Sequence, residues 1–252
     1  MNNQSISKEI LYWYDNNKRI LPWRKHLSNK QKEYFTLVSE IMLQQTQVKT
    51  VIPYFEVFIK KFQTLESLSQ AKEKKVLKLW EGLGYYRRAR NLLATSKILV
   101  NKHNSKLPKC INEIKTLPGI GEYTANVLIA LIYNKPTLAF DGNVKRVISR
   151  IFNVDEKKFD FKNFKNLNTK KLFNTKRNSD LVEAIMEFGA LICNAKTPKC
   201  IKCPIKKYCK FFKSPHKTYK IKKNKIRKNV NIFCYLSKNG KIALTKNNNV
   251  GF

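Results

Sequence analysis

Residues 117–146 place a glycine turn and a carboxylate within one helix of each other. The turn contains Gly119 and Gly121, and the residues after it predict a helix over 122–133. Amide N–H groups at such a helix start face outward, where a phosphate oxygen can bind. Asp141 then precedes a second predicted helix start. The alternative is that the glycine turn and Asp141 are ordinary helix caps. That explains each feature alone, but not the two together at this separation.

A second carboxyl group, that of Glu40, lies beside an apolar stripe. Phe35, Val38 and Met42 repeat every three to four residues, which predicts an amphipathic helix. An acid near a buried face is usually paired or turned to solvent. Desolvation among apolar side chains would nevertheless raise its pKa, whereas a helix N-terminus favours Asp141 as the anion. The two environments could therefore keep one carboxyl group protonated and the other ionised.

Three polar stretches have side chains suited to nucleic-acid bases. Residues 44–47 read Gln-Gln-Thr-Gln, and amides of this kind can contact base edges or wedge into a stack. Residues 85–88 read Tyr-Tyr-Arg-Arg, which fits intercalation plus phosphate contact. Half-buried tyrosines under a solvated basic face are the alternative. Residues 23–24, Trp-Arg, could be loop packing or a stacking edge for a flipped base.

Four of the six cysteines form a cluster spaced Cys-x6-Cys-x2-Cys-x5-Cys, at Cys193, Cys200, Cys203 and Cys209. In a cytoplasmic protein such a cluster indicates a metal site rather than disulfides. Thiolates suit both zinc and a cubane iron–sulfur cluster. Zinc sites usually pair two short Cys-x2-4-Cys knuckles, and only one is present here. Cys110 and Cys234 carry no pattern and are expected to be small buried hydrophobes.

Composition favours a polyanionic partner. The 252 residues carry 51 Lys+Arg against 17 Asp+Glu, a net charge of +34. Lys, Asn and Ile are abundant throughout, as in a chain shaped by AT-biased coding, so only basic residues beside motifs carry weight. The N-terminus lacks a secretory h-region and the longest apolar run is too short to span a membrane. The expectation is a bacterial cytoplasmic protein, associated with the nucleoid when bound to DNA.

Hydrophobic periodicity predicts an all-α protein. Helices are expected over about residues 7–16, 51–62, 73–80, 85–102, 122–133, 143–152 and 181–193, besides the one that contains Glu40. Ser7 is the expected cap of the first helix, and Pro53 is expected in the first turn of the helix over 51–62. Strand-like alternation appears only from residue 229, where NIFCYL and KIALTK predict a hairpin.

With these features in order, residues 6–246 resemble adenine DNA glycosylases of the MutY family, in the endonuclease III (helix-hairpin-helix) superfamily. The matching stretches are SEIMLQQTQV, TVIPYF, LWEGLGYYRRARN, LPGIGEYTA, DGNVKRV and the cysteine loop. The six-two-five cysteine spacing is the pattern of that superfamily's [4Fe–4S] cluster loop. The resemblance implies a two-lobed helix-hairpin-helix glycosylase fold with DNA in the cleft.

The resemblance also implies a domain organisation. Residues 1–28 and 136–213 would form the iron–sulfur lobe, and residues 29–135 a six-helix module. A basic linker over 214–228 would lead to residues 229–252, a truncated start of the β-rich C-terminal domain. In the family that domain recognises 8-oxoguanine, and here only its first hairpin is expected.

The family excises adenine mispaired with 8-oxoguanine by flipping it out of duplex DNA. By resemblance Glu40 is the general acid and Asp141 the carboxylate that stabilises the sugar cation, with Asn143 orienting water or Asp141. The chemistry needs such a pair, because adenine leaves poorly as an anion and an oxocarbenium ion needs a negative neighbour. Tyr123 stands where bifunctional lyases carry a Schiff-base lysine, which implies a monofunctional hydrolase.

The remaining site residues are assigned by the same resemblance. Those matching the adenine pocket are Trp23, Arg24, Leu43 and Glu187. Gln45 and Tyr85 match residues that probe the opposite base, and further DNA contacts are expected from Gln44, Arg87, Gly119 and Gly121. The expected partner is duplex DNA with A opposite 8-oxoguanine or G, bound by a monomer.

Two rival functions remain. An endonuclease III-like glycosylase would act on oxidised pyrimidines, but Tyr123 and residues 44–47 argue against it. A non-catalytic iron–sulfur DNA-binding module is the other rival, and the presence of both Glu40 and Asp141 argues against that.

Overall fold

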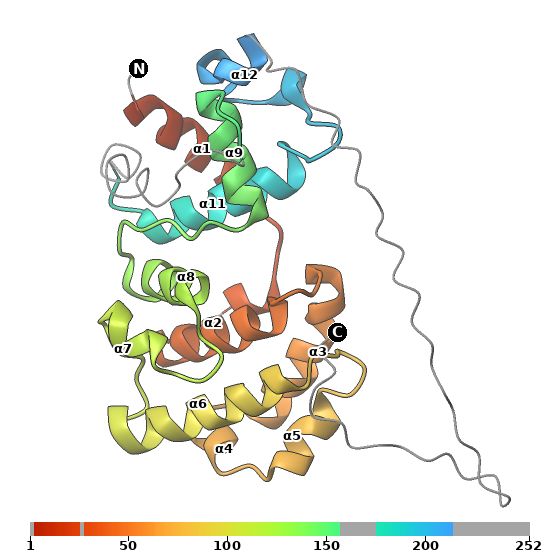
Figure 1. The fold of residues 1–252 in the computed structure, drawn as a ribbon, viewed down its shortest axis with the longest axis vertical. Coiled ribbons are helices and arrows are strands. Elements are labelled where there is room, and N and C mark those ends of the chain that lie inside the picture. The colour runs from red at the N-terminus through yellow and green to blue at the C-terminus, as the bar shows by residue number, and fades with distance from the viewer. Residues whose placement is uncertain (1–2, 26–27, 157–174, 214–252) are drawn as a thin grey trace, which may run out of the picture. The chain divides into compact units, whose positions relative to one another are not determined.

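The computed structural model describes residues 3–25, 28–156 and 175–213, and all of them lie in one compact unit, residues 1–216. Within these ranges the regular structure is helical and contains no strand, so the all-α prediction is confirmed (Figure 1). No helix in the same ranges is both long and apolar enough to cross a membrane. The predicted linker, the hairpin and Cys234 lie outside the described residues.

The first group of helices is built on the chain after Ser28, whose side chain caps α2 by accepting from the N–H of Gln31 at 3.2 Å. These helices are α2 (Asn29–Leu43), α3 (Val48–Lys61), α4 (Leu65–Ser69), α5 (Glu73–Leu79), α6 (Arg87–His103), α7 (Ile111–Lys115) and α8 (Glu122–Tyr133). Two of these helices, α4 and α7, are short, with five residues each.

Aromatic packing anchors this first core. The ring of Phe55 on α3 meets the rings of Trp23 at 5.4 Å and Phe35 at 5.5 Å, both edge to face. Trp23 lies in a 3-10 turn, η1 (Pro22–Arg24), that precedes α2. Edge-to-face pairs add to the free energy gained by burial alone. The packing therefore fixes η1 against α2 and α3, in the first core.

The second group of helices comprises α1 (Asn3–Asn17), α9 (Gly142–Phe152), α11 (Asn178–Leu191) and α12 (Lys210–Lys213), with two 3-10 turns, η2 (Cys200–Lys202) and η3 (Lys206–Tyr208). On α9 the apolar residues Val144, Val147, Ile148 and Ile151 follow the helical period and are buried. They pack with α1 and α11 in a core separate from the first.

Helix α8 belongs to both cores. Ala125, Leu128 and Ile129 pack in the first, while Val127 and Ala130 pack in the second. A helix that is apolar on all sides is buried on all sides, and α8 accordingly lies between α2 and α11 (Figure 1). It positions the two lobes around the residues at its own N-terminus.

Three local expectations were wrong. Ser7 lies inside α1 and is buried, because the helix starts four residues earlier than predicted. Helix α3 starts at Val48, so Pro53 is inside the helix rather than in its first turn. Cys110 is exposed at the start of α7 and is not a buried hydrophobe.

Candidate active site

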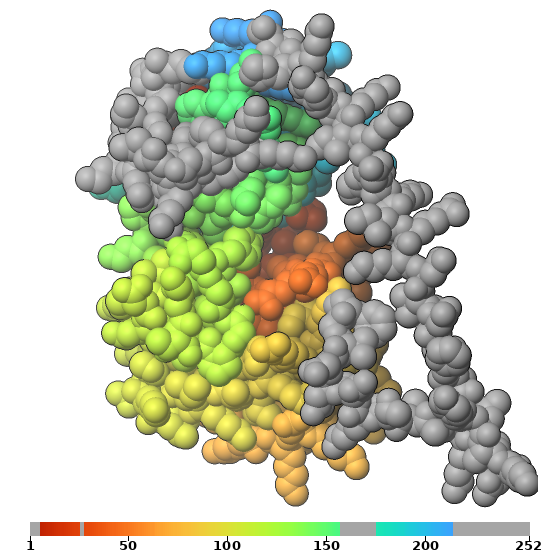
Figure 2. Space-filling view, viewed as in Figure 1, coloured from red at the N-terminus to blue at the C-terminus, as the bar shows by residue number. Residues whose placement is uncertain are grey.

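A cavity of about 1250 Å³ is lined by residues of both cores. Figure 2 shows a recess bordered by the orange surface of α2 and the green surfaces of α8 and α9. The structure brings most predicted site residues to its wall, namely Trp23, Arg24, Glu40, Leu43, Gln44, Gln45, Gly121, Tyr123, Asp141, Asn143 and Glu187. Tyr85, Arg87, Gly119 and the four clustered cysteines lie elsewhere.

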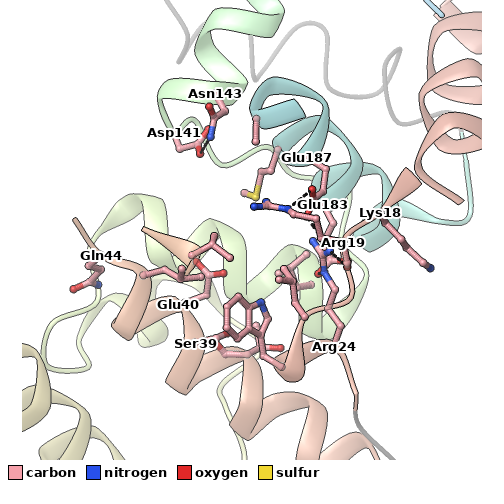
Figure 3. Close-up of a pocket in the computed structure, with 18 of the residues that line it drawn as sticks. Lys18, Arg19, Arg24, Ser39, Glu40, Gln44, Asp141, Asn143, Glu183 and Glu187 are labelled. Atoms are coloured by element: carbon pink, nitrogen blue, oxygen red, sulfur yellow. Dashed lines mark hydrogen bonds and ion pairs between the residues drawn. The ribbon is translucent and has the colours of Figure 1, made fainter. Parts of the chain in front are cut away.

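Glu40 lies in the last turn of α2, with its carboxyl group facing this cavity (Figure 3). Burial raises its pKa to about 8, and the nearby charges of Glu183 and Asp141 contribute to the increase while Arg24 opposes it. Desolvation and like charges both disfavour the carboxylate. Glu40 therefore carries its proton at neutral pH, and the predicted direction of the pKa shift is confirmed.

Asp141 is the N-cap of α9. Its Oδ1 accepts from the backbone N–H of Val144 at 2.6 Å, and its Oδ2 accepts from Nδ2 of Asn143 at 3.2 Å. These two hydrogen bonds fix the orientation of the Asp141 carboxyl group at the start of the helix. Figure 3 shows Asp141 and Glu40 on facing walls of the cavity.

The orientation of Asn143 is set by Arg146. Nη2 of Arg146 donates to Oδ1 of Asn143 at 2.8 Å and to the carbonyl of Gly189 at 2.7 Å. Because Oδ1 accepts from a cation, Nδ2 of the amide must face Asp141. Gly189 permits this contact, since a Cβ there would lie 2.7 Å from Cβ of Asn143.

Tyr123 lies in the first turn of α8 and lines the same cavity. Burial, together with the charges of Glu40 and Asp141, raises the pKa of its phenol, so the hydroxyl stays neutral at physiological pH. A neutral phenol close to two carboxyl groups can donate a hydrogen bond but cannot form an imine.

An ion-pair cluster on α11 and η1 forms another part of the cavity wall. Arg24 bonds Glu183 at 3.1 Å and Glu187 at 3.0 Å, and Arg19 bonds Glu187 at 2.8 Å. The hydroxyl of Tyr14 donates to Glu183 at 2.5 Å. Glu187 is only 1% exposed and both its oxygens are bonded to arginines, so it acts as an anchor for Arg24 and Arg19.

Sequence reasoning missed Glu183. It faces the cavity, and its charge helps to raise the pKa of Glu40. The signal was present, because Glu183 precedes Glu187 by one helical turn in a segment predicted to be helical, so the two share a face. Tyr14 and Arg19 were missed as well, and no spacing in the sequence joins them to α11.

The side chain of Gln44 lines the cavity and also donates hydrogen bonds to the glycine turn and the start of α8. Its Nε2 donates to the carbonyl of Gly119 at 3.2 Å and to Oγ1 of Thr124 at 3.3 Å. Gly119 has a φ of +76°, and a Cβ there would lie 2.7 Å from the amide of Asn91. Gly121 is the N-cap of α8. The turn is thus held by α2 and α6, with the start of α8 beside the cavity.

Residues 85–88 divide into an exposed and a buried part. Tyr85 is 55% exposed and Arg87 is exposed, as a DNA contact requires. Arg88 is instead only 7% exposed and donates to backbone carbonyls, so it is not available for the phosphate contact that this stretch was expected to make. The first turn of α6 points this guanidinium into the core.

Residues 38–172 match the family of HhH-GPD superfamily base excision DNA repair proteins. The chain is 40% identical over 251 residues to an adenine DNA glycosylase of Buchnera aphidicola subsp. Baizongia pistaciae, covering 96% of this chain and 69% of that protein. This chain belongs to the adenine DNA glycosylase family. It is also 35% identical over 208 residues to the human adenine DNA glycosylase, of which it covers 38%.

Solved structures share the fold of this family member. A thermostable thymine-DNA glycosylase superposes with a TM-score of 0.72 at 25% identity, covering 84% of this chain and 97% of that one. Endonuclease III in a non-covalent DNA complex gives a TM-score of 0.67 at 22% identity over 84% of this chain and 97% of that one. The chain spans 63% of the length of a second relative, the adenine DNA glycosylase of Buchnera aphidicola subsp. Schizaphis graminum, at 39% identity.

The four cysteines of the family's cluster loop border one small cavity between α9, α11, η2 and η3. Burial, followed by the charges of Cys209, Cys193 and Cys200, raises the pKa of the Cys203 thiol to about 12. Without a cation beside it the Cys203 thiol stays protonated, whereas a metal ligand must be the thiolate. Within the described ranges no three His, Cys, Asp or Glu side chains are arranged to hold a single metal ion.

Proposed function

We propose that this protein is a monofunctional DNA glycosylase that hydrolyses the N-glycosidic bond of adenine opposite 8-oxoguanine or guanine in duplex DNA. The observation that carries the proposal is the pair of carboxyl groups on facing walls of the cavity, Asp141 and a Glu40 that is protonated at neutral pH. Duplex DNA is the partner and the protein acts as a monomer in the bacterial cytoplasm.

Glu40 supplies the proton for the departing base. Adenine is a poor leaving group as an anion, so proton transfer from Glu40 as the C1′–N bond breaks lets it leave neutral. A donor with a pKa near 8 is protonated at pH 7 and still gives up its proton readily. Glu40, ionised by this step, can then accept the proton that the attacking water loses.

Asp141 stabilises the cation that bond breaking leaves on the sugar. Its position at the start of α9 and its bond from Asn143 keep a negative charge fixed beside that site. Tyr123 offers a hydroxyl rather than an amine, so water is the nucleophile and the DNA strand is left with an abasic site.

The cysteine loop fits a [4Fe–4S] cluster held by Cys193, Cys200, Cys203 and Cys209. When bound, the cluster supplies the positive charge that four thiolates require and fixes the loop geometry. Lys199, Lys202 and Lys206 are exposed on this loop and are available to DNA phosphates.

Alkali-induced strand scission tests the function. The purified protein is incubated with three duplexes, which carry A opposite 8-oxoguanine, A opposite G, and thymine glycol. We expect scission at adenine in the first two and only after alkali, because a monofunctional enzyme leaves the backbone intact. Scission at thymine glycol without alkali would instead identify an endonuclease III-like lyase. A protein that binds these duplexes but cuts none would be a non-catalytic module.

A further inference from the structure

Arg88, in the first turn of α6, joins two segments that are far apart in sequence. Its Nη1 donates to the carbonyl of Met42 at 2.6 Å and to that of Gln44, at the end of α2. Its Nη2 donates to the carbonyls of Leu83 at 3.3 Å and Gly84 at 3.2 Å, in the loop before α6. One planar guanidinium thus holds two loops in a fixed relation.

Each of these loops contains a residue in the left-handed backbone region. Gln45 has a φ of 57° and Tyr85 a φ of 49°, a conformation that L side chains seldom adopt unless the surroundings impose it. The carbonyls of Gln44 and Gly84 belong to the peptide groups immediately before these residues. Arg88 therefore bonds the two peptides from which Gln45 and Tyr85 project.

Aromatic rings complete the site. The guanidinium carbon of Arg88 lies 5.2 Å from the centre of the Tyr85 ring and 5.7 Å from that of Trp80, and Nε1 of Trp80 donates to the Gly84 carbonyl at 3.1 Å. Among the described residues no carboxylate forms an ion pair with Arg88. Its charge is balanced by carbonyl dipoles and ring faces alone. Lysine cannot replace the planar guanidinium of Arg88, because one ammonium group cannot reach the carbonyls of both loops.

We propose that Arg88 is a positioning residue that holds Gln45 and Tyr85 in one arrangement and thereby sets how well the enzyme distinguishes 8-oxoguanine from guanine opposite adenine. This inference rests on the proposed function. Stacking by Tyr85 and hydrogen bonding by Gln45 depend on where the two side chains stand relative to each other. The competing role is purely structural: Arg88 would only cap α2, and its loss would disturb Glu40 and slow excision from every duplex equally.

Single-turnover excision by Arg88→Lys separates these roles. Rates are measured on duplexes with A opposite 8-oxoguanine and A opposite G, with Arg90→Lys as the matched control, because Arg90 makes only an exposed pair with Glu73. We expect the ratio of the two rates to fall by roughly 5-fold or more in Arg88→Lys and to stay unchanged in the control. The pH profile, which Glu40 sets, should keep its midpoint. If excision slows equally on both duplexes, or if the midpoint of the pH profile shifts, Arg88 has a structural role only.

Two exposed-loop variants keep the test decisive if Arg88→Lys folds poorly. Tyr85→Leu removes the ring from an exposed position, and Gln45→Gly keeps the left-handed backbone without the amide. Each should lower the same ratio, and an unchanged ratio in both overturns the inference. In the combined Tyr85→Leu and Gln45→Gly background, Arg88→Lys should lower the ratio no further. If the wild-type protein excises adenine from neither duplex, it is the proposed function that is wrong.

Discussion

Asn143 donates from Nδ2 to Oδ2 of Asp141 across 3.2 Å, while its own Oδ1 accepts from Arg146 at 2.8 Å. The carboxylate is therefore held from both sides, by the amide and by the N–H of Val144 at 2.6 Å. An electrostatic group that is fixed before the reaction needs no reorganisation when charge develops on the sugar.

Glu40→Gln should abolish adenine release and leave duplex affinity within a few-fold. The amide keeps the shape of the side chain but has no acidic proton, and general acid catalysis contributes about 10²–10⁴ in rate. Single-turnover excision and equilibrium binding to the A:8-oxoguanine duplex measure the two effects. Near-wild-type excision by the variant would remove Glu40 from the mechanism.

The excision rate should fall as pH rises through about 8, because Glu40 then loses the proton that it donates. The same pKa predicts an effect on stability. The folded state retains a proton that the unfolded state loses near pH 4.5, so the free energy of unfolding should decrease between about pH 4.5 and 8.

Glu40→Gln should remove this pH dependence. At pH 7 the variant should be more stable than the wild type, by on the order of 2 kcal/mol. The difference is smaller than the pKa shift alone implies, because solvent in the open cavity partly screens the charge of Glu40. Denaturant unfolding at several pH values measures the difference. Parallel stability profiles for the two proteins would contradict the raised pKa.

Asp141→Asn and Asp141→Ala should separate catalysis from helix capping. Asparagine caps a helix as well as aspartate does, so Asp141→Asn should lose excision by about 10² or more while keeping its melting temperature. Alanine removes the cap as well and should cost about 1 kcal/mol of stability besides the activity. An active Asp141→Asn variant would show that the charge of Asp141 is not needed.

Gly189→Ala should impair both folding and excision. The new Cβ would meet Asn143 at 2.7 Å on Cβ and 3.1 Å on its backbone oxygen, so α11 or α9 must move. Overpacking of this kind costs about 1–3 kcal/mol. The matched control is Gly142→Ala, where a Cβ meets nothing within 4 Å. Thermal melting and excision should stay near wild type in the control, and equal losses in both variants would refute the close approach at Gly189.

Anaerobically purified protein should be brown and contain about four irons per chain. Cys203→Ser should lose iron and weaken DNA binding more than it lowers the helix content, because the loop carries exposed lysines and contributes only Ile205 to the buried residues of the second core. Metal analysis, circular dichroism and binding at two salt concentrations measure these effects. One zinc per chain without iron would overturn the cluster assignment.

The sequence alone determined the helices and the motifs carried on them. Apolar periodicity is a local property, so α8 was predicted at its observed bounds, Glu122–Tyr133, and α5 and α9 to within one residue. The cap at Asp141 and the burial effect on Glu40 also follow from near neighbours in the chain. The cysteine spacing is equally local, and the four thiols do border one cavity.

Only the tertiary structure decided which polar side chains meet. Glu183 reaches Arg24 and Tyr14 because α11 packs against α1 and η1, and Arg88 points inward because the first turn of α6 faces the end of α2. Gln44 bonds the glycine turn for the same reason. Such pairings depend on the distance and rotation between helices far apart in sequence. No local pattern encodes these, since they arise when two separate cores close around α8.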